Sequence, residues 1–389
     1  MTSHLLPRRR FIALVGGGAV FAAAPLAGCS SSPYPAAAVG AWEPVAPDTD
    51  LRRWMLAHAL LAPNPHNRQP WVADLRRDGE ITLVCDAARL LPETDPFGRQ
   101  VLIGCGAFVE LAVLAAAERG VRVDVQAFPD GEPGARELPG GRAVARLVLK
   151  AGAARDPLFA QIRRRHTHKG EYDSARAVAA ADWAALAACA GERGVQAGAV
   201  TDAPRVAELR ALTREAYRIE ITTDRTYLES AHLMRVGASE IERHRDGISI
   251  PGAMPALMSA IGLFDRFEVP RAGSANLQRA MDRWAPFETG SGYFWLASRG
   301  NGRRAQVDSG RAWVRAHLQA TALGLEMHPL SQALQEFAEM RGPYEALHRV
   351  LGFDPAADTV QMFGRVGHAK APWAGTPRRP LDDLVGPRA

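Results

Sequence analysis

The chain has 389 residues but contains little lysine and little cysteine. Its positive charge comes almost entirely from arginine, since the lysines are only Lys150, Lys169 and Lys370. The four cysteines are widely spaced, which excludes a disulfide framework and the close cysteine pairs of a structural zinc site. Three of them lie in apolar runs and are expected to be buried free thiols: Cys85, Cys105 and Cys189.

Two other patterns are missing. No G-x-G-x-x-G follows a strand-like run, which argues against a Rossmann nicotinamide site. The net charge is +5, yet the arginines are scattered and no basic run alternates with aromatics, which argues against nucleic-acid binding. A small anionic ligand needs only a few converging cations and fits this pattern better. Hydrophobic residues make up 47% of the chain, as is ordinary for a globular protein with a sizeable core.

The N-terminal residues have the features of a targeting signal. Arg8-Arg9-Arg10-Phe11-Ile12 matches the core of a twin-arginine export signal, and the apolar run 13–26 follows it. Leu26-Ala27-Gly28-Cys29 resembles a lipobox, so we expect a signal peptide over 1–28 and a lipid on Cys29. The other interpretation is an uncleaved anchor helix.

Residues 29–47 are rich in Ser, Pro and Ala, and we expect them to form a flexible tether. Export by the twin-arginine route would place a folded protein on the periplasmic or cell-surface side. The lipid would then hold the protein at a membrane.

A proline-rich stretch, Pro63-Asn64-Pro65-His66-Asn67-Arg68-Gln69-Pro70-Trp71, separates a helix-like run from a strand-like run. Its prolines fix φ and remove backbone donors, so it should be a stiff loop. The interleaved side chains of Asn64, Asn67 and Gln69 would display carboxamides that suit the edge of a heterocycle. An ordinary helix-to-strand turn would use the same residue types.

A second stretch, Arg163 to Lys169, is strongly basic. In an extended segment the side chains of Arg165, Thr167 and Lys169 would point the same way and could bind a phosphate. A solvated basic turn is the alternative. A metal site is less favoured, because His166 and His168 have no third ligand nearby in sequence.

Periodicity and turn signals predict an alternation of helices and strands. The helices are expected at 48–61 (capped by Asp48 or Thr49), 101–119, 179–190, 203–221, 225–243, 256–267, 309–323, 334–339 and 344–351. The strands are expected at 71–75, 81–85, 121–128, 143–149, 195–200, 292–298 and 359–364. The irregular stretch 246–267 is a candidate lid in which Met254, Met258 and Phe264 would cover a ring; a core helix with an entry loop is the alternative.

The loop Pro63–Trp71 resembles the P-S-x-x-N-x-Q-P-W signature of the nitroreductase-like flavoproteins, especially their double-length, Acg-like branch. The resemblance implies FMN as cofactor, with its ring against Pro63, Asn64, Pro65, Asn67 and Gln69. Arg165-x-Thr167-x-Lys169 resembles the family's phosphate-binding element, although the aromatic that usually follows is displaced to Tyr172. The resemblance adds a ring-side segment, Met327-His328-Pro329, and a phosphate contact from Arg378 or Arg379.

The resemblance also implies an α+β fold with two degenerate halves, 48–150 and 151–389, fused as a single-chain pseudo-dimer. Mixed or antiparallel sheets covered by helices would form its centre, with one FMN between the halves. The chemistry would take place at flavin N5, with no compulsory catalytic side chain. It would pass electrons from NAD(P)H or another donor to a nitroaromatic or quinone-like acceptor. The alternative is a protein that holds flavin under a closed lid without turnover.

Overall fold

The computed structural model describes residues 32–46 and 50–386, and residues from Pro33 onward form one compact unit. The expected signal peptide, Cys29, Asp48 and Thr49 lie outside the described residues. Helix α3 spans Leu51–Ala59, and its cap is Asp50, whose carboxylate accepts from the backbone N–H groups of Arg52 and Arg53. The helix therefore begins later than expected.

The first half contains a four-stranded antiparallel sheet in the order β1-β2-β4-β3. Its strands are β1 Trp71–Asp74, β2 Glu80–Cys85, β3 Val121–Ala127 and β4 Ala143–Ala151. The expected hairpin is confirmed, with Trp71 opposite Cys85. Along β2 the side chains alternate between buried and half-buried, because one face of the sheet lies in the core shared with α3 and α4 (Arg99–Glu118).

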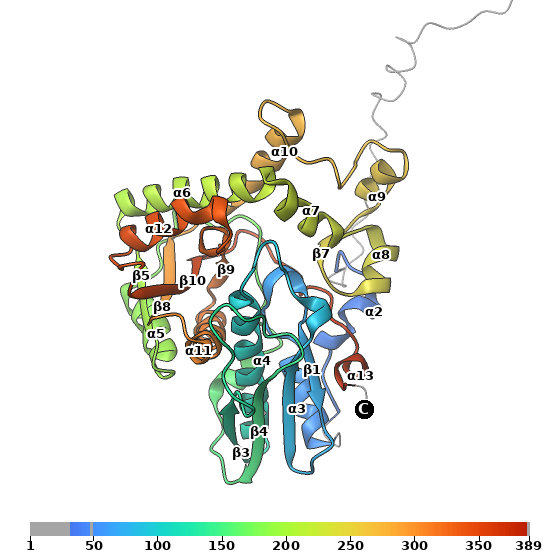
Figure 1. Cartoon of the computed structure of the whole chain (residues 1–389), viewed down its shortest axis with the longest axis vertical. Helices are drawn as coiled ribbons and strands as arrows, with labels where there is room; N and C mark the ends of the chain where they lie inside the picture. The colour runs from blue at the N-terminus through green and yellow to red at the C-terminus, as the bar shows by residue number, and fades with distance from the viewer. Residues whose placement is uncertain (1–31, 47–49, 387–389) are drawn as a thin grey trace, which may run out of the picture. The chain divides into compact units, whose positions relative to one another are not determined.

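The second half repeats this arrangement, with a four-stranded antiparallel sheet in the order β5-β8-β10-β9 (Figure 1). Its strands are β5 Gln196–Val200, β8 Gly292–Arg299, β9 Glu326–Pro329 and β10 Asp358–Gly367. Helices α5 (Ala180–Gly191) and α11 (Arg303–Ala322) belong to this half.

Helices α4 and α11 join the halves and correspond to each other. Each has 20 residues, and their first residues are 204 positions apart (303 − 99 = 204). Gly106 lies against the Val307 carbonyl and Gly310 against the Ile103 carbonyl, pairs that repeat the same offset of 204. The absence of a Cβ at both glycines lets the two backbones approach closely. The predicted α+β pseudo-dimer is therefore confirmed.

The first residue of each of these helices reaches into the opposite half. Arg99 donates to the Leu334 carbonyl at 2.5 Å, and Arg303 donates to the Phe97 carbonyl at 2.8 Å. Helix α4 is long and apolar enough to cross a membrane, with a mean hydropathy of 1.9, but 89% of that stretch is buried inside the protein. Its apolar character serves the interface between the halves.

Between β5 and β8 the chain forms a mostly helical insertion, seen at the top of Figure 1. Its elements are α6 Ala203–Thr222, α7 Asp224–His232, β6 Met234–Val236, α8 Gly237–His244, β7 Ile248–Ile250, α9 Ala253–Ala260, α10 Ala275–Trp284 and the 3₁₀ turn η5 Ala285–Glu288. The single helix predicted over 225–243 is wrong, because β6 pairs in parallel with β7 and Gly237 has φ +75°. Tertiary pairing overrides the local helical pattern there.

The remaining elements are short, apart from α12. They are α2 Ala36–Val39, η1 Gly40–Trp42, η2 Pro65–Asn67, η3 Ala87–Arg89, η4 Pro157–Gln161, η6 Gln332–Leu334, η7 Ala338–Met340, α12 Arg341–Val350 and α13 Leu381–Leu384. Residues 33–46 are not a free linker: the Ala38 carbonyl accepts from the Arg378 N–H at 2.9 Å, and Trp42 Nε1 donates to the Thr376 carbonyl at 2.8 Å.

Candidate functional site

Two arginines that are far apart in sequence meet at the C-terminal end of α3. Arg165 donates through Nη2 to the Leu61 carbonyl at 2.7 Å, and Arg378 donates to the same oxygen at 3.2 Å. Arg378 also donates through Nε to the Leu60 carbonyl at 2.9 Å. The end of a helix carries a partial negative charge, which stabilises both cations. The basic element and the proline-rich loop therefore lie side by side.

The charge of this pair is not balanced by acids. Arg165 and Arg378 are 1% and 4% exposed, and in the described part of the chain neither forms an ion pair with a carboxylate. Desolvation lowers the pKa of Arg165 to about 10 and that of Arg378 to about 9. Arg165 Nε is buried with no hydrogen-bond partner. Buried cations without a counterion are costly, so this geometry suits a bound anion.

Lys169 adds a third cation from the same segment. Solvent reaches its side chain, yet the protein surrounds it closely enough that desolvation lowers its pKa. Its charge contributes to lowering the pKa of both His66 and His328. Lys169 is therefore exposed but close to both His66 of the proline-rich loop and His328 of β9. Thr167, two residues earlier, is half-buried.

The nearby histidines are uncharged at neutral pH, because desolvation is the largest influence on each. It lowers the pKa of His66 to about 4 and holds the pKa values of His317 and His328 well below the ordinary value. Glu326 is the acid that acts electrostatically on Arg165, and burial raises its pKa to about 7. The net charge of the cluster is positive.

The proline-rich loop has an unusual backbone. His66, Asn67 and Gln69 have φ of 49°, 49° and 51°, although none of them is glycine. Left-handed residues other than glycine cost about 1–3 kcal/mol each, so the surrounding structure must hold them. Such strain commonly marks a functional segment.

The carboxamides of this loop brace it instead of pointing outward. Asn64 Oδ1 accepts from the Gln69 N–H at 2.7 Å, and Gln69 Oε1 accepts from the Arg379 N–H at 2.8 Å. Asn67 Oδ1 accepts from Arg378 Nη1 at 3.0 Å. The expectation that these groups are free to meet a heterocycle therefore needs correction. The half-buried residues Pro63 and Pro65 flank Asn64 in the same loop, and a Cβ on Gly104 of α4 would lie 3.0 Å from the Asn64 Cβ.

The other expected site residues divide into two groups. Met327 is fully buried in the core of the second half, and Pro329 lies opposite Gly364 in the sheet, so both serve the fold. His328 accepts through Nδ1 from Arg365 Nε at 3.2 Å and lies near Lys169. The Arg379 guanidinium donates to the Gln69 carbonyl at 3.4 Å and to the Asp383 carbonyl at 2.8 Å. Arg378, and not Arg379, is the arginine beside Arg165.

Sequence reasoning missed Asp246, which holds the proline-rich loop from the insertion. Its carboxylate accepts from Arg68 at 3.3 Å, Arg89 at 2.9 Å and Arg235 at 2.9 Å. Next to it, the Gly247 N–H donates to the Asn67 carbonyl at 3.2 Å. No sequence signal connects residues this far apart, so only the tertiary structure reveals the clamp.

Replacing Asp246 by alanine should destabilise the loop and the fold, because three partly buried guanidinium groups would lose their shared carboxylate. The expected loss in the free energy of unfolding is about 3–5 kcal/mol. Urea denaturation measures it. Asp224→Ala is the control, since Asp224 is exposed and pairs with Arg271 on the surface; it should change stability little. Equal stability of the two variants would contradict the role of Asp246.

A buried acid lies on the other side of the loop. Glu220 Oε1 is 3.9 Å from His66 Nε2, which also contacts Ser230 Oγ at 2.9 Å. Burial raises the pKa of Glu220 to about 7, and Gln332 and Gln335 lie beside it. Glu220 Oε2 is buried without a hydrogen-bond partner. The group is therefore close to half-protonated at neutral pH.

Glu220 should make the protein less stable as pH rises. Its folded pKa lies above that of the unfolded chain, so the stability it contributes is complete below about pH 4.5 and is lost by about pH 7. Glu220→Gln should therefore gain about 3 kcal/mol relative to the native protein between pH 4.5 and pH 8. Urea denaturation at both pH values tests this, and parallel stability curves for the two proteins would reject it.

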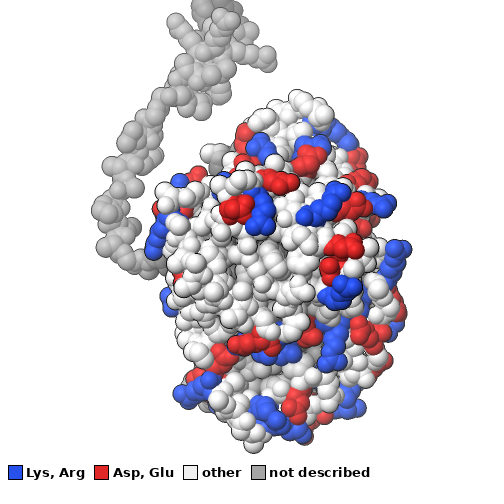
Figure 2. Space-filling view, turned by 90° about the vertical axis from the view of Figure 1, so that its left-hand side faces the viewer, with Lys and Arg blue, Asp and Glu red and all other residues white. Residues whose placement is uncertain are grey.

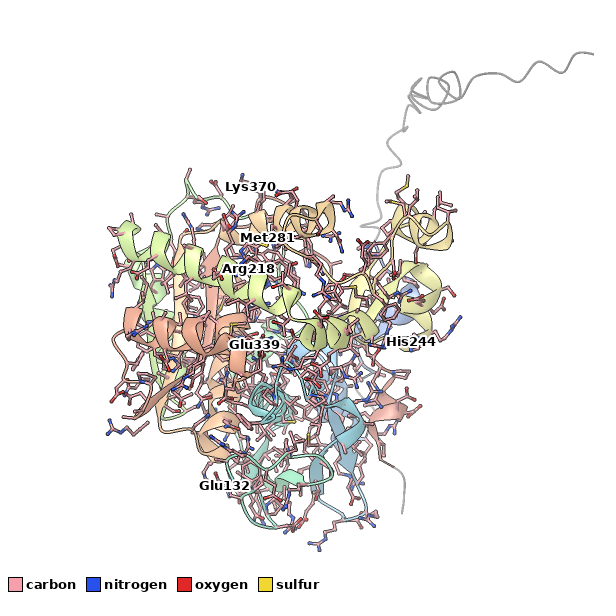
Figure 3. The ribbon with its side chains drawn as sticks, turned by 45° about the horizontal axis from the view of Figure 1, so that its top comes forward. Glu132, Arg218, His244, Met281, Glu339 and Lys370 are labelled. Carbon is pink, nitrogen blue, oxygen red and sulfur yellow. The ribbon has the colours of Figure 1, made fainter. Side chains whose placement is uncertain are left out.

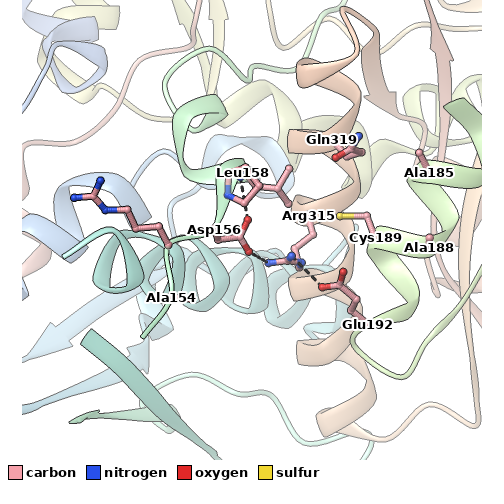
Figure 4. Close-up of a pocket in the computed structure, with 11 residues that line it drawn as sticks. Ala154, Asp156, Leu158, Ala185, Ala188, Cys189, Glu192, Arg315 and Gln319 are labelled. Carbon is pink, nitrogen blue, oxygen red and sulfur yellow. Dashed lines mark hydrogen bonds and ion pairs between the residues drawn. The ribbon is translucent and has the colours of Figure 1, made fainter. Parts of the chain in front are cut away.

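A second group of arginines, beside α5 and α11, carries a different charge pattern. A surface hollow there is lined in part by Asp156, Cys189, Glu192 and Arg315 (Figure 4). Arg315 pairs with Asp156 at 2.9 Å and Glu192 at 3.0 Å. It also pairs with the fully buried Glu110, as do Arg193 and Arg311. Carboxylates thus neutralise the arginines here, in contrast to Arg165 and Arg378.

Other ligand classes have less support in the described residues. Within 32–46 and 50–386, no group of three or more His, Cys, Asp or Glu side chains is placed to hold a metal ion. On the face of the molecule shown in Figure 2, positive and negative side chains are interspersed around a broad uncharged area. Cys85 and Cys105 are buried free thiols, as predicted, whereas Cys189 is only half-buried.

Comparison with known proteins gives whole-length relatives. No family model matches the chain. "Putative NAD(P)H nitroreductase Rv3131" of Mycobacterium tuberculosis is 30% identical over 347 residues, which cover 87% of this chain and 92% of the relative. "Putative NAD(P)H nitroreductase acg" of the same organism is 37% identical over 82 residues, covering 21% of this chain and 24% of the relative.

Solved structures are more distant. The FMN-dependent nitroreductase NfnB from Mycobacterium smegmatis, in complex with NADPH, has 15% identity and a TM-score of 0.36; the match covers 58% of this chain and 95% of that one. A nitroreductase with bound FMN from Desulfitobacterium hafniense has 14% identity and a TM-score of 0.36, with 59% and 97% covered. From the whole-length match to Rv3131, the chain belongs to the nitroreductase family.

Proposed function

We propose that this protein is an FMN-dependent oxidoreductase of the nitroreductase type. The observation that carries the proposal is the convergence of Arg165 and Arg378 on one carbonyl, beside Lys169, without a paired carboxylate. A flavin phosphate has a charge of about −2 and would balance these cations. It would also supply an acceptor for the unpartnered Arg165 Nε.

The residues present fit FMN in distinct roles. Arg165, Thr167, Lys169 and Arg378 would hold the phosphate, and the strained loop from Pro63 to Gln69 would support the ring. The braced carboxamides keep that loop rigid, so its backbone and its half-buried side chains are the surfaces offered to the ring. When bound, FMN supplies two-electron redox chemistry at N5.

The proposed donor is NAD(P)H, because the whole-length relative carries the name of an NAD(P)H nitroreductase. The proposed acceptor is a small electrophile of the nitroaromatic or quinone class. Donor and acceptor would bind at the same face of the flavin in turn, which predicts ping-pong kinetics. Glu220, close to half-protonated at neutral pH, would hold a proton beside His66 of the proline-rich loop.

The test is spectroscopic. The purified protein should be yellow, should bleach anaerobically on addition of NADPH or NADH, and should recover its colour with a nitroaromatic or a quinone. A yellow protein that does not bleach with these donors, yet is reduced by dithionite, would favour the flavin-holding alternative. A colourless protein that cannot be reconstituted with FMN would reject both.

The alternative depended on a lid over 246–267. In this structure Met254 and Met258 of that segment are 64% and 37% exposed, so they face solvent. Phe264 is half-buried. The two exposed methionines do not cover a ring here, which supports turnover over storage.

We also propose twin-arginine export and lipidation at Cys29, which rest on the sequence of residues 1–29. Changing Arg8 and Arg9 together to lysine should retain the precursor in the cytoplasm, because the export machinery reads the guanidinium pair. Cell fractionation measures this. Normal export of the double variant would reject the signal.

A further inference from the structure

One segment of the insertion is both uncharged and exposed. Residues 247–264 form a run of eighteen without an Asp, Glu, Lys or Arg. Nine large apolar side chains are exposed in the described ranges, and six of them lie within 254–267. The six are Met254, Leu257, Met258, Ile261, Leu263 and Phe267, with exposed fractions of 64%, 54%, 37%, 59%, 69% and 45%.

These side chains have no core to join. No residue of α9 is buried, and α9 contacts the rest of the protein through α8 and β6. In Figures 1 and 3 it stands at the upper right, away from both sheets, above the helix that carries His244. A concentrated apolar surface of this kind marks a face that binds an apolar partner, either another protein or a membrane.

The path of the N-terminal segment indicates which of these partners binds the apolar face. Helix α2 contacts α8, the same helix that supports α9, and α2 is fixed to the C-terminal segment through Ala38. Cys29 is seven residues before Ala36, so an extended connection reaches about 25 Å at most. The apolar run Ala13–Leu26 is little farther along the chain. With the proposed attachment, through a lipid on Cys29 or through a retained apolar run, the membrane would lie within reach of α8.

We propose that α9 and the loop following it, residues 253–267, form a membrane-docking face that inserts its apolar side chains into the bilayer interface. This proposal goes beyond the redox function and rests only on the proposed membrane attachment. Leu257 and Ile261 are four residues apart and lie on one side of the segment. The exposed Arg243 and His244 end α8 and would meet the headgroup region.

The docking face would give the protein a second contact with the membrane, in addition to the proposed N-terminal lipid. Membrane attachment at a single point leaves the orientation of a protein undefined, whereas an additional apolar face fixes it. The stretch that leads into the docking face is joined to the candidate flavin loop, because the Gly247 N–H donates to the Asn67 carbonyl. Insertion would therefore hold the redox site at a defined orientation to the lipid surface.

The experiment uses the chain from Pro33 onward, the compact unit, so that neither a lipid nor the signal contributes. Vesicles of phosphatidylethanolamine and phosphatidylglycerol should bind this protein in flotation, and raised salt should not release it. The double variant Leu257→Asp with Ile261→Asp should bind at least about tenfold more weakly, since two apolar side chains lose their burial. In the variant Leu263→Trp, the tryptophan fluorescence should shift to shorter emission wavelengths when vesicles are added.

The matched control is Leu138→Asp with Leu323→Asp, two exposed apolar residues outside the segment; this variant should bind as the native chain does. Equal binding of both double variants would overturn the proposal. An absence of vesicle binding would also overturn it. If the protein then forms a dimer that Leu257→Asp with Ile261→Asp disrupts, the apolar face binds a second copy of the chain and not a membrane. Flavin content should stay unchanged in both variants, which separates this test from that of the redox function.

Discussion

Arg378→Ala should lose most of its FMN on dialysis. The variant removes one of two buried guanidinium groups beside the Leu61 carbonyl and leaves the phosphate with Arg165 and Lys169. Hydrogen bonds between charged groups in such a site contribute about 2–4 kcal/mol together, which corresponds to a roughly 30- to 1,000-fold rise in the Kd for FMN. Fluorescence titration of the stripped protein with FMN measures it.

The neighbouring residue gives a matched control. Arg379 has the same side chain, but its guanidinium donates to the Gln69 and Asp383 carbonyls and not to the Leu61 carbonyl that Arg165 and Arg378 share. Arg379→Ala should therefore retain FMN nearly as well as the native protein. If the two variants lose flavin equally, the assignment of Arg378 to the phosphate is wrong. Arg165→Ala combined with Lys169→Ala should repeat the Arg378 result from the other segment.

Gly310→Ala should prevent stable joining of the two halves. A Cβ at Gly310 would overlap the carbonyl oxygen and carbonyl carbon of Ile103 in α4. Both are backbone atoms in the core, so they cannot rotate away as a side chain could. Since neither helix can move without disturbing both sheets, the expected loss is more than about 4 kcal/mol in the free energy of unfolding. Urea denaturation or the yield of folded protein measures this loss.

Gly342→Ala provides the comparison for this glycine. Gly342 lies near the start of α12, and a Cβ there would meet nothing within 4 Å. The same substitution should stabilise the protein by about 0.5–1 kcal/mol, because alanine favours the helix. A mild effect at Gly310 would mean that the α4–α11 contact is looser than the structure shows.

Local patterns in the sequence were sufficient for most of the two repeated sheets. The hairpin of β1 and β2, helix α4 and strand β3 lie within one or two residues of the expected positions. Each combines strong periodicity with clear turn residues, so local preference and tertiary packing agree. Helix α11 begins six residues earlier than expected, because its first turn is polar and lies buried against the other half.

The insertion was predicted less well. Its helix over 225–243 is divided by the β6–β7 pairing, and α9 begins and ends earlier than the apolar pattern suggested. The β6–β7 pair depends on partners separated along the chain, and α9 rests only on its contacts with α8 and β6 and has no buried residue. Hydrophobic periodicity carries no information about tertiary partners, so from periodicity alone these residues were predicted to form longer helices.

By itself the sequence determined the family resemblance, the basic element at Arg165–Lys169 and the stiffness of the loop at Pro63–Pro70, because each depends on residue types at close spacing. Only the tertiary structure brought Arg378 beside Arg165, joined Asp246 to the proline-rich loop and turned the loop carboxamides inward. These decisions depend on which groups become buried next to one another. Burial removes water from charged and polar groups, and the partners that replace it come from parts of the chain hundreds of residues apart.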